Sequence, residues 1–360
     1  MNGLAVSIII NNYNYEAFLG EAIDSALAQT YENVEVIVVD DGSTDGSWSV
    51  IEGYGDRITA VAQTNGKQGK AFNTGFAHSK GDIIIFLDAD DYLYPEAASQ
   101  VVACWQPGIS KVHYRLQVVD GEGNPSGFTY PQGNKILATG EVWRQLLQVC
   151  TYAGVPTSGN ALSRQALEAL TPIPDSFNTM ADDYLSVLVP FYGEVRAIER
   201  PLGAYRVHGN NQWAISTMTS DRLHRFIKHD LARCELLRQK APALGHIVSD
   251  NLELRFFGRI WSRLASLKLD PQAHPVPSDR SIALAYHGVK AVSQSREIKA
   301  KRKFILSLWF LWVGLLPRPM AKPAINWLLT PASRPQLMTW LTKQLRLRKS
   351  LLVKSQLPNA

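Results

Sequence analysis

The first hundred residues alternate between two hydrophobic patterns. Short runs of aliphatic residues predict buried strands over 6–10, 34–39, 58–62 and 83–87. Between them, apolar residues recur at helical spacing and predict helices over 18–27, 43–54 and 69–78, the second of which Ser43 can cap. Strand–helix alternation of this kind is typical of a mostly parallel central sheet with helices on both faces. The sequence therefore predicts an α/β fold class.

The pattern changes beyond residue 110. Helical spacing returns at 140–150, 164–170 and 183–192, and residues 220–267 have the pattern of long amphipathic helices. We predict three regions, namely a catalytic domain over 1–215, a helical C-terminal extension over 216–298 and a basic tail over 299–360.

Polar side chains follow each of the first four predicted strands. In chain order they are Asn11 and Tyr13, Asp40 and Asp41, Asn65, and then Asp88, Asp90 and Asp91. In open α/β sheets, ligands bind beyond the carboxyl ends of the strands. We therefore expect an active site at this edge of the sheet.

The acidic residues in this set have specific chemical uses. Asp88 and Asp90 lie two positions apart after a strand and can direct two carboxylates at one ligand, as hard divalent cations require. A solvated acidic turn is the alternative. At the earlier strand end, Asp41 can accept the ring N–H of a nucleotide base.

Taken together and in order, these segments resemble glycosyltransferase family 2. The resemblance rests on 6–14 (VSIIINNYN), 38–45 (VVDDGSTD), 65–75 and 86–91 (FLDADD), and it covers about residues 4–212. It implies a GT-A-like fold that binds a nucleotide-diphospho-sugar, a divalent cation (Mn²⁺ or Mg²⁺) as cofactor, and inversion at the anomeric carbon.

The resemblance also implies roles for individual residues. Asp183, the second acid of the pair at 182–183, corresponds to the general base, and Asp90 to the metal ligand. The donor-binding positions are Asn11, Tyr13 (stacking on the base), Asp41 (the base edge), Lys70, Asp88 (the ribose side), Arg206 and His208. Asp182 stands where many relatives have Glu. Phe72 stands where many have Arg, a charge that Lys70 can supply.

We therefore expect a metal-dependent inverting glycosyltransferase, with a UDP-sugar as the favoured donor and a glycan or lipid-linked acceptor, acting in cell-surface polysaccharide or glycolipid synthesis. One alternative is a sugar nucleotidyltransferase, but that chemistry generally uses a Gly-rich basic loop after the first strand, and residues 11–15 offer none. Another alternative is a degenerate nucleotide-sugar-binding subunit. It predicts loss of Asp90 or Asp183, and both are present.

Charge is distributed unevenly along the chain. Residues 299–360 contain twelve Lys or Arg and no Asp or Glu, whereas residues 1–298 contain 25 basic and 32 acidic residues. The same tail holds four of the nine tryptophans, a residue that favours membrane interfaces. Residues 304–316 form an apolar segment too short to span a bilayer. We expect this tail to lie on an anionic membrane surface; the alternative is that 304–316 packs as a core helix against 220–267.

The remaining composition indicates a compartment. Three cysteines without a CxxC pair predict no disulfide framework, and residues 1–14 lack the basic and apolar regions of a signal peptide. The expected location is therefore the cytoplasm, peripherally on the inner face of the cell membrane. The acidic body and the tryptophan-rich tail argue against a nucleic-acid partner.

Overall fold

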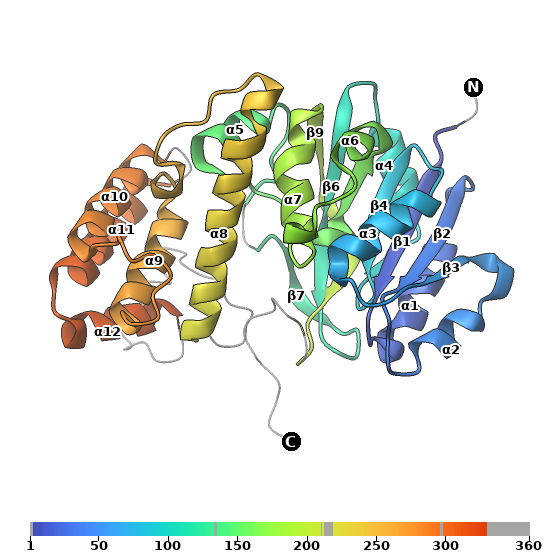
Figure 1. The fold of residues 1–360 in the computed structure, drawn as a ribbon, viewed down its shortest axis with the longest axis horizontal. Coiled ribbons are helices and arrows are strands. Elements are labelled where there is room, and N and C mark those ends of the chain that lie inside the picture. The colour runs from blue at the N-terminus through green and yellow to red at the C-terminus, as the bar shows by residue number, and fades with distance from the viewer. Residues whose placement is uncertain (1–2, 133–134, 210, 212–218, 296–297, 330–360) are drawn as a thin grey trace. The chain divides into compact units, whose positions relative to one another are not determined.

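The structure is a computed structural model that describes residues 3–132, 135–209, 211, 219–295 and 298–329. The chain forms two compact units (Figure 1). The first comprises Met1–Arg144 and Tyr152–Asn211, and the second comprises Gln145–Thr151 and Gln212–Ala360.

One half of the sheet in the first unit is parallel, as the sequence predicts. Its strands run in the order β3-β2-β1-β4. The elements are β1 (Val6–Asn12), α1 (Glu16–Leu27), β2 (Val34–Asp40), α2 (Ser47–Glu52), β3 (Thr59–Ala62), α3 (Lys67–His78) and β4 (Ile83–Asp88). Because both faces of β1, β2 and β4 are covered, these strands are buried almost throughout and consist of continuous aliphatic runs.

The other half of the sheet is mixed. The order continues from β4 through β8, β6 and β9 to β5, with β7 paired to β6. β6 and β9 are parallel, whereas β8 pairs antiparallel with both β4 and β6. The elements are β5 (Tyr92–Leu93), α4 (Ala97–Cys104), β6 (Ile109–Val119), β7 (Pro125–Tyr130), β8 (Asn160–Ser163), α6 (Arg164–Leu170), α7 (Ala181–Leu188) and β9 (Glu194–Arg206). Helix α5 (Trp143–Val149) lies mostly in the segment that belongs to the second unit. The α/β class is confirmed; the first half of the sheet is wholly parallel, and the second half is mixed.

The start of α2 differs from the prediction. Ser43 does not cap this helix, because the helix begins at Ser47 after Gly46. The Ser43 hydroxyl instead donates to Asp40 Oδ1 at 2.5 Å and accepts from Asn12 Nδ2 at 3.1 Å. Asp40 and Asn12 end neighbouring strands, so Ser43 helps to fix the rim of the sheet.

The second unit is helical, which confirms the helical C-terminal region. Its helices are α8 (Ser220–Lys240), α9 (Phe257–Leu269), α10 (Ser281–Gln294), α11 (Ala300–Leu315) and α12 (Arg318–Leu329). Short 3₁₀ helices occur across both units at Gly55–Arg57, Thr157–Gly159, Asp175–Phe177, Val189–Phe191, Pro242–Leu244 and Leu252–Leu254. Within the described ranges, no helix is both long and apolar enough to cross a membrane.

Helix α11 packs in the core of this unit through one of its faces. Leu306, Phe310 and Val313 are buried in a cluster with residues of α8, α9, α10 and α12. The alternative prediction, that 304–316 packs as a core helix, is therefore confirmed for this face of α11. Most of the predicted basic tail, 330–360, lies outside the described residues.

Two glycines allow α10 and α11 to approach closely. A Cβ at Gly314 would lie 2.3 Å from Ala285 Cβ, and one at Gly288 would lie 2.3 Å from the Phe310 ring. We expect Gly314→Ala to lower the free energy of unfolding by about 1–3 kcal/mol, the usual cost of overpacking. Urea unfolding of the native and substituted proteins measures this change in the free energy of unfolding. Gly20→Ala on α1 is the matched control, since its nearest neighbour would be at an ordinary 3.6 Å; equal effects from both substitutions would contradict the packing argument.

A buried ion pair fixes the segment between α9 and α10. Arg263 donates to both oxygens of Asp279, and His274 Nε2 lies 3.0 Å from Asp279 Oδ2. Burial alone would raise the pKa of Asp279, but the hydrogen bonds from His274 and Arg263 outweigh it and hold that pKa below its ordinary value.

A carboxylate with a lowered pKa stabilises the folded state above its unfolded pKa, and this contribution disappears as the pH falls through the folded pKa. We expect Asp279→Asn to cost about 3–5 kcal/mol near neutral pH, since it leaves Arg263 buried without its partner. The difference from the native protein should shrink below about pH 4, the ordinary pKa of Asp. Urea midpoints of both proteins between neutral pH and below pH 4 measure this stability difference. A difference independent of pH would contradict the lowered pKa of Asp279.

Candidate functional site

Strand register brings polar side chains from β1, β2 and β4 to one edge of the sheet. Asn11 on β1 is paired with Asp88 on β4, and Asn12 with Asp40 on β2. Asn11 Nδ2 donates to Asp88 Oδ1 at 3.1 Å, and Asn12 Nδ2 to Asp40 Oδ1 at 2.8 Å. The sequence-predicted residues Asn11 and Asp88 are thus in direct contact.

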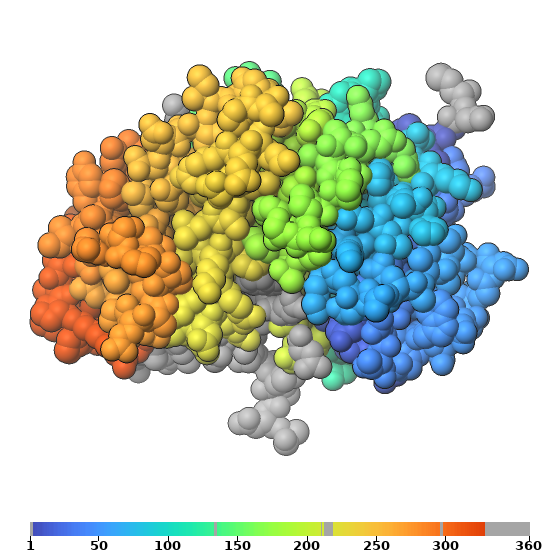
Figure 2. All heavy atoms as spheres, in the orientation of Figure 1, coloured from blue at the N-terminus to red at the C-terminus, as the bar shows by residue number. Residues whose placement is uncertain are grey.

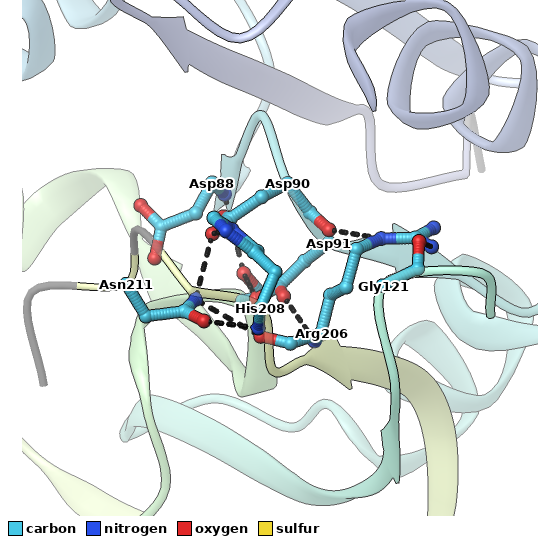
Figure 3. A network of polar contacts seen from close by, with 8 residues as sticks. Asp88, Asp90, Asp91, Gly121, Arg206, His208 and Asn211 are labelled. Carbon is cyan, nitrogen blue, oxygen red and sulfur yellow. Dashed lines mark hydrogen bonds and ion pairs between the residues drawn. The ribbon is translucent and has the colours of Figure 1, made fainter. Parts of the chain in front are cut away.

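Three carboxylates lie at the end of β4 and in the turn that follows it (Figure 3). Asp90 and Asp91 are buried, and Asp88 is half-buried. Burial, and then the charge of Asp90, raise the pKa of Asp88 to about 7. The same two causes raise the pKa of Asp91 well above its ordinary value. The turn therefore crowds carboxyl groups whose ionised forms a bound cation would stabilise.

Asp90 is held by residues that follow β9. His208 Nε2 lies 3.0 Å from Asp90 Oδ2, and Asn211 Nδ2 donates to the same oxygen at 3.1 Å (Figure 3). Asn211 Oδ1 also accepts from the His208 backbone N–H at 2.5 Å. The His208 ring packs against Tyr15 and Phe18, with centroids 5.8 and 4.9 Å apart. His208 and Asp90, predicted separately from the sequence, therefore belong to one site.

Arg206 has a different place from the one the sequence suggests. Its side chain is 3% exposed, with Nε donating to the Asp90 carbonyl at 2.9 Å and Nη1 to the Gly121 carbonyl at 2.9 Å. Its Nη2 pairs with Glu21 of α1. All three nitrogens thus contact protein groups, and the guanidinium holds the Asp90 turn (Figure 3).

Asp91 and Ser158 complete the support of this turn. Asp91 Oδ1 accepts from the Arg206 backbone N–H at 2.9 Å, and Asp91 Oδ2 accepts from Ser158 Oγ at 2.6 Å. Ser158 Oγ also accepts from the Asp88 backbone N–H at 3.2 Å. The turn is therefore pinned from both the β9 end and the Thr157–Gly159 helix.

Asp41 directly follows β2, and its carboxylate lies at the start of α3. Its carboxylate accepts from the backbone N–H groups of Gly66 and Lys67, each at 2.8 Å, and from Gln63 Nε2 at 2.6 Å. Tyr13 is 43% exposed, and Lys67 Nζ lies 5.8 Å from its ring centroid. Lys67 thus links an exposed ring to a fixed carboxylate, and such a pair suits a flat heterocycle. Lys70 is exposed on α3, and its methylenes lie against Gly66.

The first turn of α7 carries the predicted base. Asp182 and Asp183 are half-buried there, and the Asp183 backbone N–H donates to Asp182 Oδ1 at 2.8 Å. The charge of Asp182 makes a smaller contribution to the raised pKa of Asp88, so the two carboxylates are within electrostatic range of each other. The segment before α7 is fixed to α3 by the Gly69 N–H, which donates to the Asn178 carbonyl at 2.9 Å. Figure 2 shows the atoms of α3 and α7 side by side on the surface.

Several residues of the site were missed from the sequence. The sequence indicates Asp91 only as a polar residue at a strand end, and it indicates no role for Glu21, Tyr15 or Ser158. Tyr15 packs against His208, whose Nε2 lies 3.0 Å from Asp90 Oδ2, and burial and the charges of Asp90, Asp88 and Asp91 raise the pKa of Tyr15. The sequence gives a weak indication that Asn211 belongs to the site, because this residue follows the polar run that contains His208.

The donor set contains the hard oxygen ligands that Mg²⁺ and Mn²⁺ prefer. No preformed metal cluster of three or more His, Cys, Asp or Glu side chains is present in the part of the chain that the structure describes. The carboxylates of Asp88 and Asp90 fit a cation that keeps most of its coordination for substrate oxygens and water.

Comparison with known proteins identifies the family. Residues 7–149 match glycosyl transferase family 2. An uncharacterized glycosyltransferase of Nostoc is 36% identical over 234 residues, which cover 61% of this chain and 70% of the relative. The chain belongs to glycosyl transferase family 2. This glycosyltransferase is also 49% identical over 90 residues to an uncharacterized glycosyltransferase of Rickettsia typhi, covering 25% of this chain and 28% of that relative.

The fold of this glycosyltransferase is also similar to a solved structure. TarS residues 1–349 from S. aureus, determined in complex with UDP-GlcNAc, superpose with a TM-score of 0.52 at 14% identity, covering 90% of this chain and 91% of that one. At this identity the similarity supports the GT-A-like fold alone. This similarity confirms the fold class. The family match and the Nostoc relative identify the protein as a transferase enzyme.

Proposed function

We propose that this glycosyltransferase moves a sugar from a nucleotide-diphospho-sugar to an acceptor hydroxyl, with a divalent cation as cofactor and with inversion at the anomeric carbon. One observation carries the proposal: the charge of Asp182 in the first turn of α7 acts on Asp88 at the end of β4, so the two acidic turns are within electrostatic range of each other. This arrangement provides a cation-binding group and a basic group at a single site.

The donor would bind along the edge from β2 to β4. Tyr13 would stack on the base, Asp41 would accept its ring N–H, and Asp88 would contact the ribose side. TarS was solved with UDP-GlcNAc, which favours a UDP-sugar as the first donor to test. Lys70 and His208 are the proposed partners of the diphosphate. Arg206 would act on the donor only through the turn that it holds.

The chain's own residues would perform the transfer in one displacement. Asp90 would hold the cation, which when bound neutralises charge on the departing diphosphate. Asp183 would take the proton of the acceptor hydroxyl as its oxygen bonds to the anomeric carbon, while the bond from that carbon to the diphosphate oxygen breaks. The products are the glycoside with inverted configuration and a nucleoside diphosphate.

The test is a panel of nucleotide sugars with Mn²⁺ or Mg²⁺, scored by release of nucleoside diphosphate and by the configuration of the new glycosidic bond. Release of pyrophosphate instead would favour the nucleotidyltransferase alternative. Nucleotide-sugar binding without turnover would favour the degenerate binding subunit. A retained anomeric configuration would contradict the single displacement.

We also propose a glycan or lipid-linked acceptor, in cell-surface polysaccharide or glycolipid synthesis at the inner face of the cell membrane. Support comes from the sequence of the C-terminal region, with twelve cations and no acidic residue over 299–360. Such a region is attracted to an anionic leaflet by about 1 kcal/mol for each cation near the surface.

A further inference from the structure

Helix α11 carries a second apolar face opposite the one that it buries. Leu306, Phe310 and Val313 face the core of the second unit. Four other large apolar residues are exposed, namely Phe304 (65%), Leu308 (48%), Leu311 (41%) and Leu315 (57%). Their spacing of four, three and four places them on one side of the helix, because successive residues are 100° apart. Trp312, 42% exposed, borders this set.

We call these five residues the α11 stripe. A helix on the surface of a soluble protein normally has polar side chains opposite its buried face. A contiguous exposed apolar set is the mark of an interaction surface. Figure 2 shows the atoms of α10 and α12, between which α11 lies in sequence, at the surface of the second unit. The close packing at Gly288 and Gly314 fixes α11 in its orientation, so the stripe is held outward.

The charges around the stripe are of one sign. Lys301 on α11 and Arg318 and Lys322 on α12 are exposed, and no acidic residue occurs in α11 or α12. The sequence from 330 to 360 adds six more Lys or Arg and no Asp or Glu. A partner of the stripe must therefore be apolar where it meets the leucines and negative around them.

We propose that the α11 stripe docks on an anionic lipid bilayer, with α11 lying in the plane of the interface. The acyl region accepts the leucines and Phe304, the headgroups neutralise the cations, and the Trp312 ring lies at the boundary. The proposal rests on the proposed function for its purpose, since it would hold the enzyme beside a lipid-linked acceptor.

Charge disfavours the other occupants. A second copy of the chain would bring two cationic helices together without an acidic partner, and like charges in contact are destabilising. The segment 330–360 is also cationic by sequence, so its charges would likewise repel those around the stripe. A nucleic acid would neutralise the cations, but it would leave the leucines without an apolar partner.

The experiment is co-sedimentation of the full chain with vesicles of phosphatidylcholine alone and with phosphatidylserine as about a third of the lipid. We expect the native protein to bind the anionic vesicles at physiological salt and the neutral ones weakly. Leu308→Gln with Leu315→Gln should reduce anionic-vesicle binding about tenfold or more, because two inserted leucines are lost. Ile136→Gln with Ile247→Gln is the matched control, since both isoleucines are highly exposed outside the stripe.

Each other outcome overturns the proposal. Native protein that stays in the supernatant excludes the bilayer. Equal binding by the stripe and control variants assigns adsorption to charge alone. A native dimer that the stripe variant converts to monomer, without vesicle binding, assigns the stripe to self-association.

Nucleoside diphosphate release with a soluble acceptor is measured on the same preparations without vesicles. The stripe variant should retain it, so loss of vesicle binding and failure of the proposed transfer are distinguished. Absence of turnover in the native protein would contradict the proposed function and leave the vesicle result standing.

Discussion

Asp90→Asn is expected to reduce sugar transfer by about 10³-fold or more, because the substitution removes the charge that would hold the cation and stabilise the leaving diphosphate. The fold should persist. Asparagine can still accept the hydrogen bonds from His208 and Asn211 through Oδ1. The measurement is nucleoside diphosphate release, with thermal unfolding recorded alongside it.

Asp56→Asn is the control for this substitution. It removes the same charge from an exposed position in the 3₁₀ helix Gly55–Arg57. Native turnover in Asp90→Asn, or full turnover of the native enzyme in excess EDTA, would contradict the cation role.

Asp183→Asn is expected to lower turnover by about 10²–10⁴-fold and to leave donor affinity nearly unchanged, because the carboxylate would act on the acceptor hydroxyl. Turnover at saturating donor and equilibrium binding of the nucleoside diphosphate measure the two quantities separately. Collapse of donor affinity would assign Asp183 to the donor site, and Asp182 would then be the first alternative base.

An acid in the first turn of a helix also stabilises that helix, since it interacts with the helix dipole. Asp221 lies in the first turn of α8 and provides the matched control. Asp221→Asn and Asp183→Asn should have similar small effects on stability. Only the second should affect turnover, and equal losses of turnover would indicate a structural role for Asp183.

Local sequence determined the elements that carry most of the site. β1, β2 and β4 are aliphatic because both of their faces are buried, and this pattern can be recognised without a partner strand. Polar residues at the ends of parallel strands must reach the same edge of the sheet. Asn11 and Asp88 could therefore be placed in the site from the sequence.

The second half of the sheet could not be derived in the same way. β6 buries Lys111 and His113 among its aliphatic residues, and β9 contains several charged residues, which weaken the hydrophobic pattern of both strands. Their pairing joins residues that are far apart in the chain. The mixed order of these strands depends on this long-range pairing, so it is decided only by the tertiary structure.

Only the tertiary structure shows which residues hold the acidic turn after β4 in place. Glu21, Ser158 and Arg206 come from α1, a 3₁₀ helix and the end of β9, and none has a local pattern that indicates contact with the turn. For Arg206, the sequence could indicate a charged residue near the site. It could not indicate that the guanidinium would be buried and turned toward the Asp90 carbonyl.

For helix α11 as well, the sequence determines one property and the tertiary packing determines another. Its sequence is apolar on almost all sides, which predicts a helix that meets apolar surroundings but does not select the face that packs. Gly288 and Gly314 allow α10 to approach one side closely, which selects Phe310 and Val313 for the core. The sequence alone thus determined that α11 is apolar and flanked by cations. The packing of α10 decided that Leu308 and Leu315 remain exposed.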